Sequence, residues 1–166
     1  MIETERLLMR RLDPWSDDLN SYLNWMRDID SNKYIESVNP DFSMLELCEY
    51  VEKKNYSSHV LLLGIFDKSI FRHIGNIKFE PIDIYSREAW VGILIGEKDY
   101  RALGIGFEAM EAGMTYLKNS EEISVFHLGV DKNNLAGVRL YEKLGFKHNK
   151  ELAKKRGHEV LSKRIS

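Results

Sequence analysis

One short segment constrains this chain of 166 residues more than any other. Residues 101–106 read R-A-L-G-I-G and stand between a strand-like run, Trp90 to Ile95, and a helix-like run, Ile105 to Leu117. A glycine-bearing turn that opens a helix presents unpaired backbone N–H groups and the positive end of the helix dipole. Both features suit the negative charge of a diphosphate. The segment therefore predicts a strand–turn–helix unit with an anion site at the turn.

The spacing of apolar residues predicts the other elements. Helices are expected to begin at Ser16 and, in a capping box with Glu46, at Ser43. A further helix over Asn134–Leu144 ends at Gly145, against which Phe146 packs. Period-two and continuous apolar runs predict strands, which fall at Glu5–Leu12, Val60–Phe66, His73–Phe79, Glu88–Ile95 and Ile123–Val130. The tail is expected to form a hairpin that turns at Arg156-Gly157, and the whole reads as an α/β domain with a mixed sheet.

Composition sets outer limits on function. The formal net charge of −2 gives no electrostatic reason to expect nucleic acid or an anionic membrane as a partner. Cys48 is the single cysteine and falls on an apolar helix face, so it predicts core packing and no disulfide. The five histidines are dispersed, without metal-ligand spacing. No apolar run reaches the length of a membrane span. We expect one cytoplasmic domain over residues 1–166, with no metal.

Three readings of the glycine segment compete before any family is considered. Gly104-x-Gly106-x-x-Ala109 matches the dinucleotide fingerprint, and Asp131 lies somewhat beyond the expected acidic position. In that fold the first glycine follows its strand almost at once, whereas here a mostly polar stretch intervenes. A phosphate-binding P-loop needs Lys after the last glycine, where this chain has Phe107. The segment can also be a turn whose glycines only allow close contact between helix and sheet.

A second segment favours a fourth reading. Residues 134–146 read N-L-A-G-V-R-L-Y-E-K-L-G-F. This run resembles a signature of the GNAT acetyltransferases, and Arg101-x-x-Gly104-x-Gly106 resembles the diphosphate motif of that family. Residues 3–7 (E-T-E-R-L) and 73–76 (H-I-G-N) look like the branch that acetylates ribosomal-protein N-termini, polyamines and amino sugars. The resemblance implies a GNAT fold, with a mixed central sheet of about six to seven strands flanked by about four helices and splayed at the cofactor strand.

The resemblance also implies how acetyl-CoA is held. The pantetheine arm would pair with freed backbone groups around Leu94, Ile95 and Gly96, like an added strand. Backbone amides would cradle the diphosphate, with glycine required at two positions so that no β-carbon displaces the phosphates; the residues are Ala102, Leu103, Gly104, Ile105 and Gly106. Four further residues of the two motifs are expected at the cofactor: Arg101, Gly137, Leu140 and Lys143.

Two motif residues have a second interpretation. Asn134 can bond the pantetheine amide, or it can cap the helix that begins at Leu135. Arg101 can add positive charge at the diphosphate, or it can be a solvated surface cation. Lys143, one turn from Arg139, could reach the adenine-side phosphate or face solvent. The motif favours the cofactor contact for Asn134, and residue types alone do not decide the other two.

Tyr141 is expected to be the general acid. Attack of a neutral amine on the acetyl thioester expels a thiolate, which needs a proton or a hydrogen bond. A phenol of pKa about 10 protonates a thiolate of pKa about 8.5 at a cost of roughly 2 kcal/mol. Tyr141 would therefore act mainly through a hydrogen bond to the developing anion. Without the motif, the same tyrosine reads as half-buried packing.

The general base is less well marked. Relatives often carry a carboxylate two residues before Gly92, where this chain has Trp90. Glu88 lies on the same strand face, one pleat away, and is the expected base, with Glu80 as an alternative. Either carboxylate would act through a water molecule.

The substrate is expected to be a primary amine of low basicity. Deprotonating a lysine-like amine at pH 7 costs about 4.6 kcal/mol, against about 1–1.5 kcal/mol for an α-amine. A site without a strong base should prefer the less basic amine. A nucleotide-linked amino sugar therefore leads, a protein N-terminus or a polyamine follows, and a catalytically silent CoA-binding domain is the rival class. Expected walls of the substrate site are Trp25, Asp28, Tyr34 and Glu36, and the family also implies a homodimer.

Overall fold

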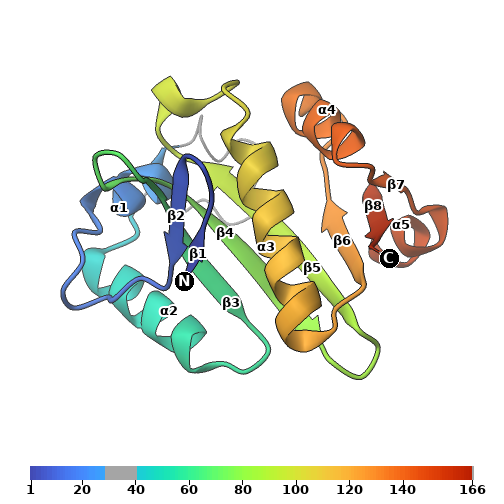
Figure 1. The fold of residues 1–166 in the computed structure, drawn as a ribbon, viewed down its shortest axis with the longest axis horizontal. Helices are drawn as coiled ribbons and strands as arrows, with labels where there is room; N and C mark the ends of the chain where they lie inside the picture. Colours follow the sequence, from blue (N-terminus) through green and yellow to red (C-terminus); the bar gives the residue numbers. More distant parts are fainter. Residues whose placement is uncertain (29–40, 166) are drawn as a thin grey trace.

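A computed structural model describes residues 1–28 and 41–165 and shows one sheet of eight strands with helices on both faces (Figure 1). The strand order is β1-β2-β3-β4-β5-β6-β8-β7. The strands are β1 (Ile2–Glu3), β2 (Leu7–Arg10), β3 (Leu61–Asp67), β4 (Arg72–Asp83), β5 (Glu88–Ile95), β6 (Val125–Gly129), β7 (Lys147–His148) and β8 (Val160–Arg164). The helices are α1 (Asn20–Arg27), α2 (Met44–Tyr56), the short 3₁₀ turn η1 (Lys98–Tyr100), α3 (Ile105–Glu121), α4 (Leu135–Lys143) and α5 (Lys150–Arg156).

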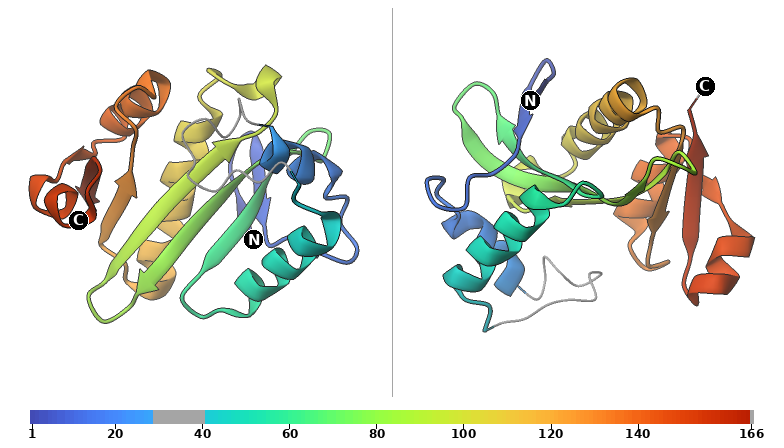
Figure 2. Two further views of the ribbon diagram at one scale, coloured as in Figure 1. Left: turned by 180° about the vertical axis from the view of Figure 1, so that it is seen from behind. Right: turned by 90° about the horizontal axis from the view of Figure 1, so that it is seen from below.

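Two apolar clusters cover the two faces of the sheet. α3 lies on one face, where Ala109, Met110 and Met114 pack against strands β2 to β6. α1 and α2 lie on the other face, where Leu23 and Leu47 pack against β3 (Figure 2). β5 contributes to both clusters because successive side chains of a strand point to opposite faces: Ala89 and Val91 join the α3 side, and Leu94 joins the other. We call the second side the α1/α2 face.

The sheet opens between β5 and β6, which are its only parallel neighbours among the described strands. Their pairing covers three residue pairs, Glu88↔Val125 to Trp90↔His127. Beyond Trp90, β5 stays paired with β4 as far as Ile95, whereas β6 continues to Gly129 paired with β8 alone. None of the described strands therefore pairs with the β6-facing edge of residues 91–95. The splayed cofactor strand that the family resemblance implied is confirmed.

Several local expectations are confirmed by the structure. Ser43 and Glu46 form the capping box of α2. Gly145 adopts φ +85° just after α4, and Phe146 is buried beside Tyr141. Cys48 is buried as a free thiol in the α1/α2 core.

Other expectations are wrong. α1 does not begin at Ser16, because residues 13–17 form a turn in which the Asp17 carboxylate is bound by Arg10, and the helix starts at Asn20. The tail is not a simple hairpin: β7 and β8 do pair, but α5 stands between them, capped by Asn149. The expected mixed α/β fold itself is confirmed: the described part of the chain has eight strands and five α-helices, close to the expected six to seven strands and four helices.

None of the helices in the described part of the chain combines the length and apolar character needed to cross a membrane.

Candidate active site

The segment that links β5 to α3 has an unusual backbone. Ala102 has φ +60° and Gly104 has φ +78°, both in the left-handed region. Glycine adopts this region without the steric penalty that a β-carbon brings, whereas alanine pays it. Gly104 is also the residue immediately before α3, and no side chain caps the N-terminus of this helix. The chain thus enters its longest helix through a strained turn.

This turn leaves a run of amides without acceptors. Among the described residues, none accepts a hydrogen bond from the backbone N–H groups of residues 102–107, and the first N–H of α3 to be paired is that of Glu108, bonded to the Gly104 carbonyl. Unpaired N–H groups at a helix start, with the helix dipole behind them, favour an anion. These amides suit the diphosphate cradle predicted at Ala102, Leu103, Gly104, Ile105 and Gly106, and the contact with a diphosphate stays a prediction.

Arg101 turns back toward β5. Its guanidinium donates to the carbonyl oxygens of Ile95 (2.9 Å) and Gly96 (3.1 Å). These carbonyls lie at the open end of the gap between β5 and β6. The side chain thus contacts strand backbone that the pantetheine arm was expected to use, and a direct role at the diphosphate stays a prediction.

The packing of α1 against the end of β5 requires glycine at position 96. A β-carbon at Gly96 would lie 2.0 Å from Cδ2 of Trp25, so the indole packs directly against the glycine backbone. The Trp25 indole N–H also donates to Glu97 Oε1 at 3.1 Å. Trp25, predicted as a wall of the substrate site, is buried and fixes α1 against the end of β5.

α4 meets α3 at the cradle. A β-carbon at Gly106 would lie 3.1 Å from Cδ2 of Leu140 and 3.9 Å from Cδ1 of Ile93, so both helices and β5 converge there. Asn134 is the cap of α4: its Oδ1 accepts from the Gly137 N–H at 2.9 Å. A β-carbon at Gly137 would lie 2.7 Å from Nδ2 of Asn134, which explains why glycine suits that position. The contact between Asn134 and pantetheine stays a prediction. The side-chain NH2 group of Asn134 would make it, because Oδ1 already accepts from Gly137.

Tyr141 lies on α4, partly buried against the α3-side core. Its ring packs edge-on against Phe146, with centroids 6.2 Å apart. Burial raises the pKa of the Tyr141 hydroxyl above its ordinary value of 10. The phenol is therefore neutral at physiological pH and can donate a hydrogen bond, while loss of its proton is harder than in water.

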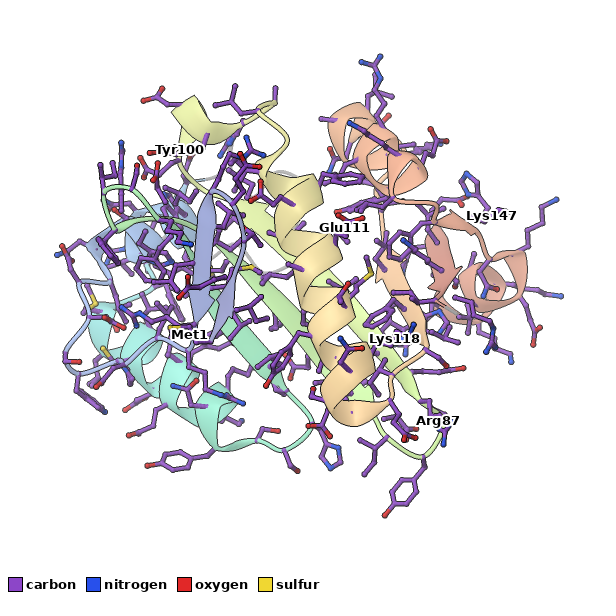
Figure 3. The ribbon with its side chains drawn as sticks, in the orientation of Figure 1. Met1, Arg87, Tyr100, Glu111, Lys118 and Lys147 are labelled. Atoms are coloured by element: carbon purple, nitrogen blue, oxygen red, sulfur yellow. The ribbon has the colours of Figure 1, made fainter. Side chains whose placement is uncertain are left out.

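A groove of about 870 Å³ runs along the outer side of the cradle, between β1 and α3. It is lined at one end by Gly104, Phe107 and Lys143, and the Lys143 ammonium lies over the Phe107 ring, 5.1 Å from its centroid. Side chains of β1 and α3 border the rest; Figure 3 labels Met1 and Glu111 among them.

A row of polar and aromatic groups crosses the α1/α2 face where the sheet begins to open. Trp90 and His127 are cross-strand neighbours with rings 5.4 Å apart. His127 Nε2 lies 3.3 Å from Glu88 Oε2, and its Nδ1 lies 2.7 Å from Ser162 Oγ. Arg156, at the end of α5, stacks over Trp90 with Cζ 4.5 Å from the ring centroid. Glu88, the expected base, is therefore half-exposed and tied to a buried histidine.

Glu80 is less suited to be a base. It contacts both Lys54 and Lys78, the latter at 2.9 Å. Burial alone would raise the pKa of Glu80, but the hydrogen bonds from the two lysines lower it overall. A carboxylate held in its charged form by two ammonium groups is a weak proton acceptor.

Sequence reasoning missed His127 and Arg156, and it used Arg6 only as part of a family resemblance. The partner of His127 depends on the register of three strands, and the place of Arg156 depends on an unexpected helix. Of the remaining expected wall residues, Asp28 ends α1. Tyr34 and Glu36 lie outside the described residues. The described part of the chain contains no group of three or more His, Cys, Asp or Glu side chains arranged to hold a metal ion.

Comparison with known proteins decides the family. The model of the acetyltransferase (GNAT) domain matches residues 6–147, most of the chain. This chain belongs to the GNAT acetyltransferase family. It is an acetyl-CoA-dependent acyltransferase of that fold class.

Relatives and solved structures agree with this assignment. A probable spermine N(1)-acetyltransferase from Bacillus subtilis subsp. natto is 24% identical over 119 residues, covering 72% of this chain and 74% of the relative. Spermidine N-acetyltransferase from Vibrio cholerae, solved with CoA and spermine, superposes with TM-score 0.80 at 21% identity, covering 98% of this chain and 96% of the other. The microcin C7 self-immunity acetyltransferase, solved with acetyl-CoA and AMP, gives 0.79 at 18% identity, with 98% and 94% covered. At these identities the superpositions show the shared GNAT fold.

Proposed function

We propose that this GNAT enzyme acetylates the primary amine of a small molecule of low basicity, with a nucleotide-linked amino sugar as the leading class. The observation that carries the class is the charge on the α1/α2 face beside Trp90. Glu80 is neutralised by Lys54 and Lys78. Arg156 stacks over Trp90 and has no carboxylate partner among the described residues. A polycationic amine would meet net positive charge there, whereas a sugar carrying phosphate would meet a stacking surface and a guanidinium.

The residues present fit acetyl-CoA. The unpaired amides of residues 102–107 suit a diphosphate, and the free edge of β5 from 91 to 95 suits an added strand-like arm. Acetyl-CoA would supply an acetyl thioester. Gly137 and Leu140 shape the α4 side of that cleft, and Lys143 stands at its outer end near Phe107.

Tyr141 and Glu88 are the proposed proton-transfer groups. The amine nitrogen forms a bond to the acetyl carbon as the carbon–sulfur bond breaks. Tyr141 hydrogen-bonds to the departing sulfur and gives it a proton late, because its raised pKa opposes early transfer. Glu88, through water, accepts the proton that the nitrogen loses. The His127 ring positions Glu88 through its Nε2 atom, and Ser162 Oγ fixes the ring through its Nδ1 atom.

The test is thiol release from acetyl-CoA with matched acceptors: a nucleotide-linked amino sugar, the free amino sugar, a short peptide with a free N-terminus, and spermidine. We expect the highest kcat/KM on the nucleotide-linked sugar. Faster turnover on spermidine would contradict the charge argument, and faster turnover on the peptide would indicate a protein N-terminus. CoA binding without turnover on any acceptor would identify a catalytically silent CoA-binding domain.

A further inference from the structure

The Arg6 side chain connects the start of the chain to the phosphate-facing turn. Its terminal nitrogen NH1 donates to the Leu103 carbonyl at 2.9 Å. Its Nε and NH2 atoms reach Glu108 Oε2 at 2.7 Å and 2.6 Å. A planar guanidinium can make these contacts at once because its donors point in fixed directions. Arg6 thus bridges the turn before α3 and the first turn of α3 itself.

Glu108 is held from several sides. Besides the guanidinium, the Arg6 backbone N–H donates to Oε1 at 3.1 Å, and Thr4 Oγ1 donates to the same oxygen at 2.5 Å. Burial alone would raise the pKa of Glu108, but the hydrogen bonds from Thr4 and Arg6 lower it overall. The carboxylate is therefore charged at neutral pH. Four donors fix its position and, through it, that of Arg6.

The bond to Leu103 sets the direction of the central amide of the cradle. In a planar trans peptide, the carbonyl oxygen of one residue and the N–H of the next point in opposite directions. Because Arg6 holds the Leu103 carbonyl, the Gly104 N–H points away from Arg6. The guanidinium is also close: a β-carbon at Gly104 would lie 3.5 Å from its NH2. Arg6 therefore stands behind the amide that an anion would contact.

Arg6 also balances a charge. Glu108 lies in the first turn of α3, where a diphosphate on the cradle would meet its negative charge. An unpaired carboxylate so close to the cradle would repel the diphosphate, whereas a carboxylate paired with a guanidinium repels it much less. The guanidinium supplies that pairing without occupying the amides.

We propose that Arg6 is a positioning residue for the diphosphate: it turns the Gly104 N–H outward and neutralises Glu108, without touching the reacting atoms. This inference rests on the proposed use of CoA at the same site. The affinity that depends on Arg6 belongs to the diphosphate half of CoA and not to the pantetheine arm.

The test compares CoA with pantetheine, which keeps the arm and lacks the diphosphate. Affinities are measured for wild type, Arg6→Gln and Arg6→Lys, by calorimetry for CoA and by competition for pantetheine. We expect Arg6→Gln to weaken CoA about tenfold, since a charge-assisted fork is lost, and to leave pantetheine unchanged. Arg6→Lys keeps the charge but cannot hold Leu103 and Glu108 together, so an intermediate loss is expected.

Arg10→Gln is the matched control, because Arg10 makes a similar two-armed pair with Asp17, away from the cradle. It is expected to change thermal stability without changing CoA affinity. Unchanged CoA affinity in both Arg6 variants, or equal losses for CoA and pantetheine, would overturn the proposal. If Arg6→Gln does not fold, Arg6→Lys alone decides. A wild-type protein that does not bind CoA would refute the proposed function itself, which is a separate result.

Discussion

The starts of α3 and α4 differ sharply, although both helices contribute to one cleft. α4 begins with Asn134, whose side chain accepts the Gly137 N–H. α3 begins after a left-handed glycine and has no side-chain cap, so its first amides have no acceptor among the described residues. α2 and α5 follow the α4 pattern, with Ser43 and Asn149 as caps. α1 also begins without a side-chain cap, after Leu19, but α3 combines the missing cap with a left-handed glycine, and that combination needs a reason.

The reason is competition between a cap and a ligand. A Ser, Thr, Asp or Asn at position 104 would satisfy the helix amides, but its oxygen would occupy the place of an external anion. The glycine there leaves the amides available. The proposed function gives anion binding to α3 and proton donation to α4, which carries Tyr141. Four variants test this division, from the largest expected effect to the smallest.

The first variant addresses α4. Tyr141→Phe keeps the packing with Phe146 and removes only the hydroxyl. We expect turnover to fall about 100-fold, the lower range for loss of a general acid, while CoA affinity stays unchanged. Steady-state rates and calorimetry measure the two effects. Tyr116→Phe, on the exposed side of α3, is the control. Wild-type turnover in Tyr141→Phe would show that the Tyr141 hydroxyl on α4 is not the general acid.

The second variant addresses α3. Gly104→Ala places a β-carbon at a residue with φ +78°. Gly157→Ala is the control: its φ is +76°, and no atom lies within 4 Å of a β-carbon at Gly157. Both are expected to cost about 1 kcal/mol of unfolding free energy. Only Gly104→Ala is expected to weaken CoA, by about tenfold, because relief of the strain rotates the cradle amides. If both variants bind CoA equally well, the turn is not the diphosphate site.

The third variant separates the two roles of Asn134. Asn134→Ala removes the α4 cap and is expected to cost about 1 kcal/mol, as is Asn149→Ala at α5. Asn134→Asp keeps a capping oxygen but loses the amide donors. If Asn134 also bonds pantetheine, Asn134→Asp will weaken CoA while melting near the wild-type temperature. Wild-type affinity in Asn134→Asp would leave the residue a cap alone.

The smallest effect concerns charge in the first turn. α3 has Glu108 there, and α4 has no acid. Because the folded pKa of Glu108 is lowered from 4.5, its contribution to stability is present above pH 4.5 and is lost as pH falls through the folded value. We expect Glu108→Gln to cost about 1 kcal/mol or less at pH 7. Urea unfolding should show that difference vanish at low pH; a constant difference would contradict the ion pair.

The sequence predicted those features that depend on local chemistry. β5 was expected over Glu88–Ile95 and has those bounds, because its apolar run is continuous. The Ser43 capping box and the αL glycine at 145 follow from residue type and spacing. The unpaired amides at 102–107 follow from the glycines of one turn. Each of these features is decided within a few residues.

The missed features depend on long-range contacts. Arg6 meets Glu108 across 102 positions. The Glu88–His127–Ser162 row requires the register of β5, β6 and β8 together. α5 is short and largely exposed, so it has no apolar stripe that would distinguish it from a loop. Sequence patterns locate backbone geometry well, but they do not choose among distant charged partners.

The gap between β5 and β6 also affects how this protein can interact with other chains. An unfinished sheet offers backbone groups to any extended chain, including a neighbouring molecule. CoA at 100 times its dissociation constant would add about 2.7 kcal/mol to the folded state and would cover that edge. If CoA binds along this edge as proposed, we expect it to compete with any extended chain that pairs with residues 91–95.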